Sequence, residues 1–109
     1  SYPWLVDPAW AYGKGYVHVR ANYLGLHENL LDTTHFSFLH AGNVGTLEYA
    51  TAPYEVDSTG PGVRISRHLA ESVLPKLYDE PMDLVGRPVD RYTDSHFVSP
   101  GWHAAHAKV

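Results

Sequence analysis

The 109-residue sequence contains no cysteine. This absence excludes disulfide bonds, thiolate nucleophiles, and any zinc site or iron–sulfur cluster held by cysteines of this chain. A reducing compartment suits such a chain, and we expect a cytoplasmic protein. Basic residues are also scarce: the 8 lysines and arginines stand singly, and the formal net charge is −4. No basic stripe is available to neutralise phosphates, so we expect no nucleic-acid partner.

Long apolar runs are missing as well. No stretch approaches the roughly 18 apolar residues of a membrane-spanning helix, and residues 1–4 do not read as a signal peptide, so we expect no membrane partner. Histidine, by contrast, is abundant, because the 8 histidines equal all lysines and arginines together. Histidine titrates near neutral pH and is the commonest metal ligand in proteins. The composition therefore directs the search toward a metal site.

Two segments in the first half of the chain have regular apolar patterns. Residues 16–20 alternate with period two and include β-branched side chains, which predicts a strand. Residues 24–39 have apolar side chains at helical spacing and contain no proline, which predicts a helix. Gly42 and Asn43 follow it, and both residue types commonly end helices.

The second half of the chain is predicted to be rich in strands. Residues 54–57 and 63–66 flank a loop containing glycine and proline, which predicts a β-hairpin. Residues 72–87 predict a long connection or lid, and residues 92–98 and 102–109 predict two further strands. The fold class that we expect is α+β, with a curved antiparallel sheet around a helix.

The densest chemical pattern lies between Asn29 and His40. Asn29, Asp32 and His35 are spaced by three, so on a helix they form one polar stripe among leucine and phenylalanine side chains. Polar groups enclosed by apolar neighbours need partners, and a metal ion is one such partner. His40 lies about 140° around an ideal helix from His35. Both imidazoles can therefore reach one ion only if the helix is distorted or ends near Ser37.

The same residues allow two other interpretations. The histidines can be hydrogen-bonded core or surface residues, with Asn29 and Asp32 in solvent, in a metal-free domain that binds a small molecule. Two histidines and an aspartate in apolar surroundings also suit a zinc hydrolase, in which a metal-bound water is the nucleophile. The spacing alone does not choose among these interpretations.

Asn29, Asp32, His35 and His40 follow the pattern Asn-x-x-Asp-x-x-His with a second histidine after a short gap. In this context the segment resembles the iron-binding segment of Rieske non-heme iron oxygenases, most closely the vanillate O-demethylase and toluenesulfonate monooxygenase branch. The flanking Asn-Leu-Leu-Asp and Phe-Leu-His-Ala-Gly sequences match as well. A weaker likeness continues to Gly101. The resemblance covers most of this chain but only the middle of a family protein.

The resemblance implies a role for each residue of the motif. His35 and His40 would be two ligands of a mononuclear Fe(II), completed by a carboxylate from later in the protein to give a facial triad with open positions for O₂. Asp32 would bridge His35 and a histidine at the Rieske 2Fe-2S cluster of a neighbouring subunit. Asn29 would lie beside the iron as a polar neighbour or weak ligand. We therefore assign Asp32 and Asn29 as catalytic residues.

The resemblance also implies the architecture and the reaction. Residues 1–109 would be a partial helix-grip (START-like) catalytic domain, with the Rieske domain before it and the remaining part after it. The activity implied is monooxygenation or dioxygenation of an aromatic, methoxylated or carboxylated substrate, by O-demethylation or ring hydroxylation. Electrons would arrive from NAD(P)H through a reductase component, and the oxygenase would be a homotrimer. We expect the isolated chain to bind iron weakly and to turn over nothing.

Several polar residues on the predicted strands remain outside the motif. His103 and His106 are an odd number of residues apart, so on a regular strand at most one of them faces a pocket. Arg64, Arg67 and Arg91 can meet an acidic aromatic substrate. Isolated arginines on strands are usually solvated, and that is the interpretation we favour for these three.

Overall fold

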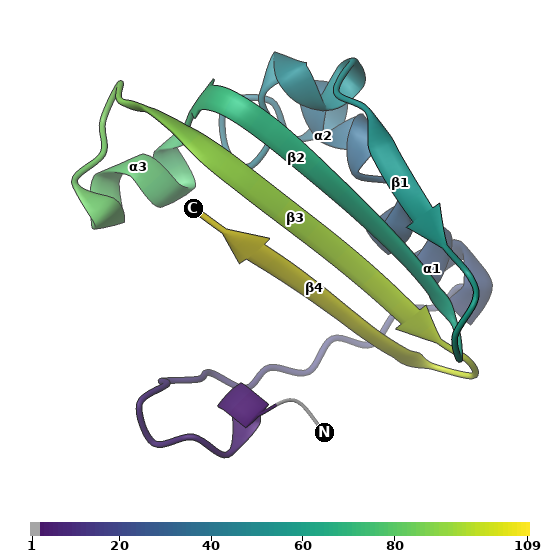
Figure 1. The fold of residues 1–109 in the computed structure, drawn as a ribbon. Coiled ribbons are helices and arrows are strands. Elements are labelled where there is room, and N and C mark those ends of the chain that lie inside the picture. Colours follow the sequence, from purple (N-terminus) through teal and green to yellow (C-terminus); the bar gives the residue numbers. More distant parts are fainter. Residues whose placement is uncertain (1–2) are drawn as a thin grey trace.

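The computed structural model describes residues 3–109. Its centre is a four-stranded antiparallel sheet in the order β1-β2-β3-β4 (Figure 1). β1 spans Tyr54–Asp57, β2 spans Val63–Val73, β3 spans Pro88–Val98 and β4 spans Trp102–Lys108. Strands that follow one another in the chain also pair with one another. The sheet is therefore a meander built from local connections.

Short helices cover one face of the sheet. They are α1, η2, α2 and η3, which span Tyr23–Leu31, Thr33–His35, Phe36–Leu39 and Leu47–Ala50. Figure 1 shows α1 and α2 behind the sheet, and α3 (Lys76–Met82) beyond one end of it. A further turn, η1, spans Pro3–Leu5. Among the described residues, none of these helices has the length and apolar character needed to cross a membrane.

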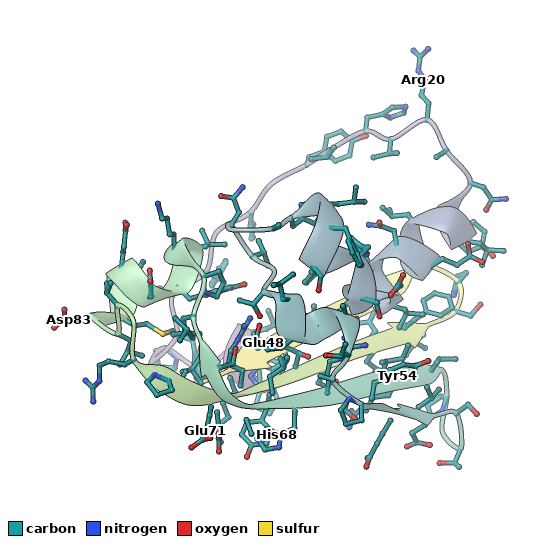
Figure 2. All side chains as sticks on the ribbon, turned by 90° about the horizontal axis from the view of Figure 1, so that it is seen from above. Arg20, Glu48, Tyr54, His68, Glu71 and Asp83 are labelled. Atoms are coloured by element: carbon teal, nitrogen blue, oxygen red, sulfur yellow. The ribbon has the colours of Figure 1, made fainter. Side chains whose placement is uncertain are left out.

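The two faces of the sheet differ in character because side chains alternate along each strand. In β2 the inward row is Ile65, Arg67 and Leu69, and the register pairs these residues with Ser95, Thr93 and Arg91 of β3. Figure 2 shows His68 and Glu71 projecting from the other face, away from the helices. The buried layer therefore contains two arginines, Arg67 and Arg91, with only 6% and 4% of their surface exposed.

A β-bulge interrupts the alternation near the end of β2. The register is regular up to Leu69 and resumes at Ser72, and Glu71 between them has a left-handed backbone with φ of 48°. The Glu71 N–H donates to the Asp90 carboxylate at 3.1 Å. Because a bulge places one extra residue in one strand, Leu69 and Ser72 both face inward and both are buried.

The sequence predicted most of the sheet. The hairpin over residues 54–57 and 63–66 and the strands over residues 92–98 and 102–109 are confirmed, although β2 and β3 are longer than predicted. The α+β class is confirmed as well.

Two predictions about secondary structure were wrong. Residues 16–20 form exposed coil, because alternation makes a strand only where a partner strand accepts its hydrogen bonds. Residues 72–87 contain α3 in place of a wholly irregular lid. The signal-peptide interpretation concerned residues 1–4, of which residues 1 and 2 lie outside the described residues.

The loop after α2 closes on the carbonyl group of His40. This oxygen accepts hydrogen bonds from the backbone N–H groups of Asn43, Val44 and Gly45, at 3.2, 3.2 and 3.1 Å. Gly45 is buried, and a Cβ atom at this position would overlap the carbonyl group of Phe36. The close approach of two backbones therefore requires glycine here.

We predict that Gly45→Ala lowers the free energy of unfolding by about 1–3 kcal/mol, the usual cost of overpacking, in urea titrations followed by circular dichroism. Gly25→Ala is the matched control, because a Cβ on Gly25 in α1 has no atom within 4 Å. Alanine in a helix is about 0.5–1 kcal/mol more stable than glycine, so the control variant is expected to gain stability. Equal losses in both variants would contradict the steric argument.

Candidate functional site

The helix predicted over residues 24–39 is two helices interrupted at Asp32, so the prediction of one continuous helix was wrong. Asp32 has an extended backbone, with φ of −80° and ψ of 91°. Its carboxylate accepts a hydrogen bond from the N–H of Thr34 at 2.9 Å and so caps the turn η2. Aspartate is among the preferred N-cap residues, and the following β-branched Thr33 and Thr34 are weak helix formers. The Asp-Thr-Thr sequence was therefore the available signal for a new helical start.

The two histidines of the motif flank α2 and lie close together. His35 ends η2, and His40 follows α2 with a non-helical backbone at φ of −120° and ψ of 25°. Their ring centroids lie 5.4 Å apart, and the ring planes are inclined by 65°. On one ideal helix the two side chains would diverge by about 140°. The change of backbone at each end of α2 removes that divergence.

The pair fits part of a metal site. The Nε2 atom of His35 is buried and has no hydrogen-bond partner, which a ligated metal would correct. With metal–nitrogen distances of about 2.1 Å, two imidazoles on one ion have ring centres roughly 4.5–5.5 Å apart. His40 is exposed, so the pair reaches the surface. Within residues 3–109, however, no group of three or more histidine, aspartate or glutamate side chains is arranged to hold a metal.

The other two residues of the motif lie apart from the imidazoles. Asp32 is exposed, and the hydrogen bond to Thr34 joins its carboxylate to the start of η2. Asn29 is exposed on α1, and in the described part of the chain no hydrogen bond links its amide to His35 or His40. The structure therefore groups the two histidines and leaves Asp32 and Asn29 on the outside of α1 and η2.

Phe36 separates the histidine pair from an internal cavity. Its ring lies 4.8 Å from that of His35 and 5.7 Å from that of His40, edge-on to both. The same phenylalanine lines a cavity of about 260 Å³ between the helices and the sheet. Most of the wall is apolar or aromatic, and includes Leu30, Val44, Tyr49, Ile65, Leu74 and Tyr78. Its volume is slightly below the range of about 300–1,000 Å³ that is usual for ligand sites.

Arg67 and Arg91 also line this cavity. Arg67 donates to the carbonyl oxygen of Tyr49 and, at 3.2 Å, to the hydroxyl of Thr34. Arg91 donates to the hydroxyls of Thr46, Ser72 and Tyr49, at 3.2, 3.3 and 3.2 Å.

The expectation that the strand arginines are solvated was therefore wrong for Arg67 and Arg91. It is correct for Arg64, whose side chain is 50% exposed and pairs with Asp94 at 3.5 Å. The burial of Arg67 was indicated by the sequence, because Arg67 is two residues from both Ile65 and Leu69 and therefore lies on the same face of the strand as these apolar residues.

Both buried guanidinium groups lie close to the ring of Tyr49. The ring centroid of Tyr49 is 5.6 Å from the guanidinium carbon of Arg67 and 5.1 Å from the guanidinium carbon of Arg91. Burial raises the pKa of the Tyr49 phenol even though Arg91, Thr93 and Arg67 act in the opposite direction. The phenol therefore stays neutral near pH 7 and does not serve as a counter-ion.

Glu48, next to Tyr49, has a carboxyl group that interacts electrostatically with Arg91. Burial opposes its ionisation, but hydrogen bonds with Thr46, its own backbone and Ser72, together with the charge of Arg91, lower the pKa of its carboxyl group. Ser72 donates to the carboxylate at 3.4 Å while it accepts from Arg91. Glu48 itself is exposed, so its charge acts on Arg91 from the surface.

A second histidine cluster lies under α1 and centres on His27, which no spacing pattern in the sequence indicated. This buried ring stacks at 5.7 Å on His103 and contacts Phe97. Because Ser95 donates to the carbonyl oxygen of Leu30 at 2.9 Å, the 2.8 Å contact between His103 Nε2 and the Ser95 hydroxyl has the imidazole as donor. Burial, with smaller effects of His27 and His96, lowers the pKa of His103.

The predicted opposition of His103 and His106 is confirmed. His103 faces the helices, whereas His106 is exposed and stacks on Trp4 at 5.5 Å.

The fold and the histidine pair define an α+β domain with a candidate metal centre. A family model of the vanillate O-demethylase oxygenase C-terminal domain matches residues 19–108. The chain belongs to this family, and the resemblance to the Rieske-type oxygenase branch inferred from the motif is confirmed. No solved structure matches the chain significantly.

Individual relatives agree with this assignment. The chain is 32% and 31% identical over 101 residues to vanillate O-demethylase oxygenase subunits of Pseudomonas sp. strain HR199 and Pseudomonas sp. strain ATCC 19151, in each case over 89% of this chain. It is 40% identical over 64 residues, 57% of this chain, to the toluene-4-sulfonate monooxygenase system iron-sulfur subunit of Comamonas testosteroni. The matches span 28%, 31% and 18% of these relatives.

We predict that Asp32→Ala lowers the free energy of unfolding by about 1 kcal/mol, the usual loss when an N-cap side chain is removed. Asp32→Asn keeps an acceptor oxygen for the Thr34 N–H and is expected to stay within about 0.5 kcal/mol of the wild type. Urea titrations of the three proteins measure both values. Equal stability of wild type and Asp32→Ala would show that the cap contributes nothing.

The lowered pKa of His103 predicts a loss of stability in mild acid. In the unfolded chain this histidine titrates near the ordinary value of about 6.5, so below that pH the unfolded state binds the proton more readily than the folded state does. Its contribution is therefore complete above about pH 6.5 and falls as the pH decreases. The measurement is the change in unfolding free energy between about pH 7.5 and 5.5 in urea titrations.

His103→Gln, which keeps a neutral donor near Ser95, is expected to show a smaller change than the wild type over the same pH interval. His18→Gln is the control, because His18 lies in exposed coil. If His103→Gln keeps the full pH dependence of the wild type, the prediction is wrong.

Proposed function

We propose that this chain is the iron-bearing part of the oxygenase component of a Rieske-type system that acts on an aromatic acid. Membership of the vanillate O-demethylase oxygenase C-terminal domain family supports this proposal. The reaction is O-demethylation or ring hydroxylation, since the relatives are named for a vanillate demethylase and a toluene-4-sulfonate monooxygenase. The sheet and its helices would then form part of a helix-grip catalytic domain.

The observation that carries the proposal is the buried, unpartnered Nε2 atom of His35 with the ring of His40 at 5.4 Å. These two imidazoles would hold the Fe(II), with a third, carboxylate ligand supplied by residues outside this chain. Bound iron would supply the binding and reduction of O₂. Phe36 lies between the imidazoles and the cavity, so it would shield that side of the centre from water.

The remaining residues of the motif would act from outside the centre. Asp32 is exposed at the start of η2 and is bonded to Thr34, so its second carboxylate oxygen is available to a neighbouring molecule. In the proposed role it links His35 to a histidine at the 2Fe-2S cluster of an adjacent subunit. Asn29 would provide a polar side chain near the entrance. A reductase using NAD(P)H would supply electrons to a homotrimer.

Iron binding tests the proposal directly. We predict that the wild-type chain, dialysed anaerobically against Fe(II), binds one ion per chain and that His35→Ala or His40→Ala weakens binding by at least about ten-fold, because even loss of a group that orients a ligand costs this much. His18→Ala, in exposed coil, is the control and is expected to bind as the wild type does. The visible absorption of Co(II) in the same site reports its ligation by nitrogen independently of iron.

Other results would support the competing interpretations. Stoichiometric zinc in the anaerobically purified chain, with hydrolysis that needs neither O₂ nor a reductant, would favour the zinc hydrolase. A folded chain that takes up neither iron, cobalt nor zinc would favour the metal-free binding domain. Either result would contradict the proposed function.

A further inference from the structure

Two positive charges lie in the interior of this small domain without a direct ion pair in the described part of the chain. Arg67 and Arg91 are 6% and 4% exposed. Among residues 3–109, the ion pairs formed are those of Arg64 with Asp94 and His68 with Asp90. Every direct hydrogen-bond partner of the two buried guanidinium groups is a hydroxyl or a carbonyl oxygen. Buried charges are normally paired, so this arrangement requires an explanation.

The two arginines differ in how much of their charge is compensated. Arg91 is linked through Ser72 to the carboxylate of Glu48. Arg67 has no such link, and its Nε atom is buried without a hydrogen-bond partner. Its guanidinium group also lies against the rings of Tyr49 and Tyr54, at 5.6 and 5.3 Å. The side chain of Arg67 is therefore fixed by its hydrogen bonds, while its Nε atom lacks a partner and its charge lacks a counter-ion among the described residues.

Both arginines lie in the wall of the 260 Å³ cavity. The rest of the wall is mainly apolar, so an anion in the cavity would meet fixed cations in surroundings with little water, where charge-assisted bonds are strongest. The lining also includes Asp94, whose carboxylate pairs with Arg64, and Lys108. The aromatic rings of Phe36, Tyr49 and Tyr78 offer surfaces on which a flat ligand can pack.

We infer that Arg67 and Arg91 form the anion-binding end of a substrate site, which holds the acidic group of a small aromatic acid while its ring packs on the apolar wall of the cavity. The guanidinium fork matches a carboxylate or a sulfonate, which accept two parallel hydrogen bonds. The inference rests on the proposed function for its substrate class, because the cavity would be where the oxygenase holds its aromatic substrate.

The chain connects this site to the candidate metal centre. Arg67 bonds to Thr34, the residue before His35, and Phe36, the residue after it, lines the cavity. A ligand held at the arginines would therefore lie next to the segment of η2 and α2 that carries His35. The acidic group would set the distance of the ring from the metal, and so would select which ring position faces it.

The test uses metal-free chain in EDTA, so that its outcome is independent of iron binding. Isothermal titration with benzoate, benzenesulfonate, neutral benzamide and acetate separates the contribution of the charge from that of the ring. Benzoate and benzenesulfonate are expected to bind at least about ten-fold more tightly than benzamide, because benzamide leaves the guanidinium groups without an anion. Acetate is expected to bind more weakly than benzoate, because it buries no ring.

Arg67→Gln is expected to lower benzoate affinity at least about ten-fold and to leave the weak binding of benzamide unchanged, whereas Arg67→Lys keeps the charge and is expected to lie between the two. Arg64→Gln is the matched control, because Arg64 lies on the same strand with its side chain on the exposed face. It is expected to bind every ligand as the wild type does. Circular dichroism verifies that each variant is folded.

The wild-type titrations keep the inference testable even if Arg67→Gln does not fold. Equal affinity for benzoate and benzamide would overturn it and leave the arginines with a structural role. Equal affinity for acetate and benzoate would overturn the aromatic class. Iron binding without preference for aromatic anions would contradict this inference and not the proposed function, whereas anion preference in a chain that binds no iron would contradict the proposed function alone.

Discussion

Tyr49, which accepts hydrogen bonds from both Arg67 and Arg91, joins the two layers of this domain. Both arginines arise from strands, yet all of their hydrogen bonds except that of Arg91 to Ser72 end on Thr34, Thr46 and Tyr49 in the helical layer. The face of an aromatic ring attracts a nearby cation without adding a negative charge. The position of the helices on the sheet therefore depends on polar contacts as much as on the small apolar core.

These contacts determine where the histidine pair lies. Thr34 precedes His35, and Thr46 follows Gly45, whose N–H bonds to the carbonyl group of His40. The short helix α2 between these points is too small to be stable by itself. The two imidazoles are thus positioned by anchors on both sides of α2, and the anchors are the arginines that line the cavity.

The sequence predicted features that depend on local pattern, and missed those that depend on what packs against them. The hairpin at Tyr54–Asp57 followed from its turn residues, whereas residues 16–20 alternate in the same way and form no strand. The motif histidines were found from spacing, but the break at Asp32 was taken for part of one helical stripe. The burial of Arg67 was missed because alternation shows which residues share a face without showing which face is covered.

The bulge at Glu71 divides β2 into two parts in which the alternation of inward and outward side chains differs by one residue. Up to Leu69 the odd-numbered residues point inward, and from Ser72 the even-numbered ones do, so that Ser72 and Leu74 are both buried. Without the bulge, the same sequence in a regular strand would turn Ser72, a partner of Arg91, out to solvent. The bulge therefore decides which side chains at this end of β2 reach the interior, and added residues should be tolerated at the hairpin tip rather than here.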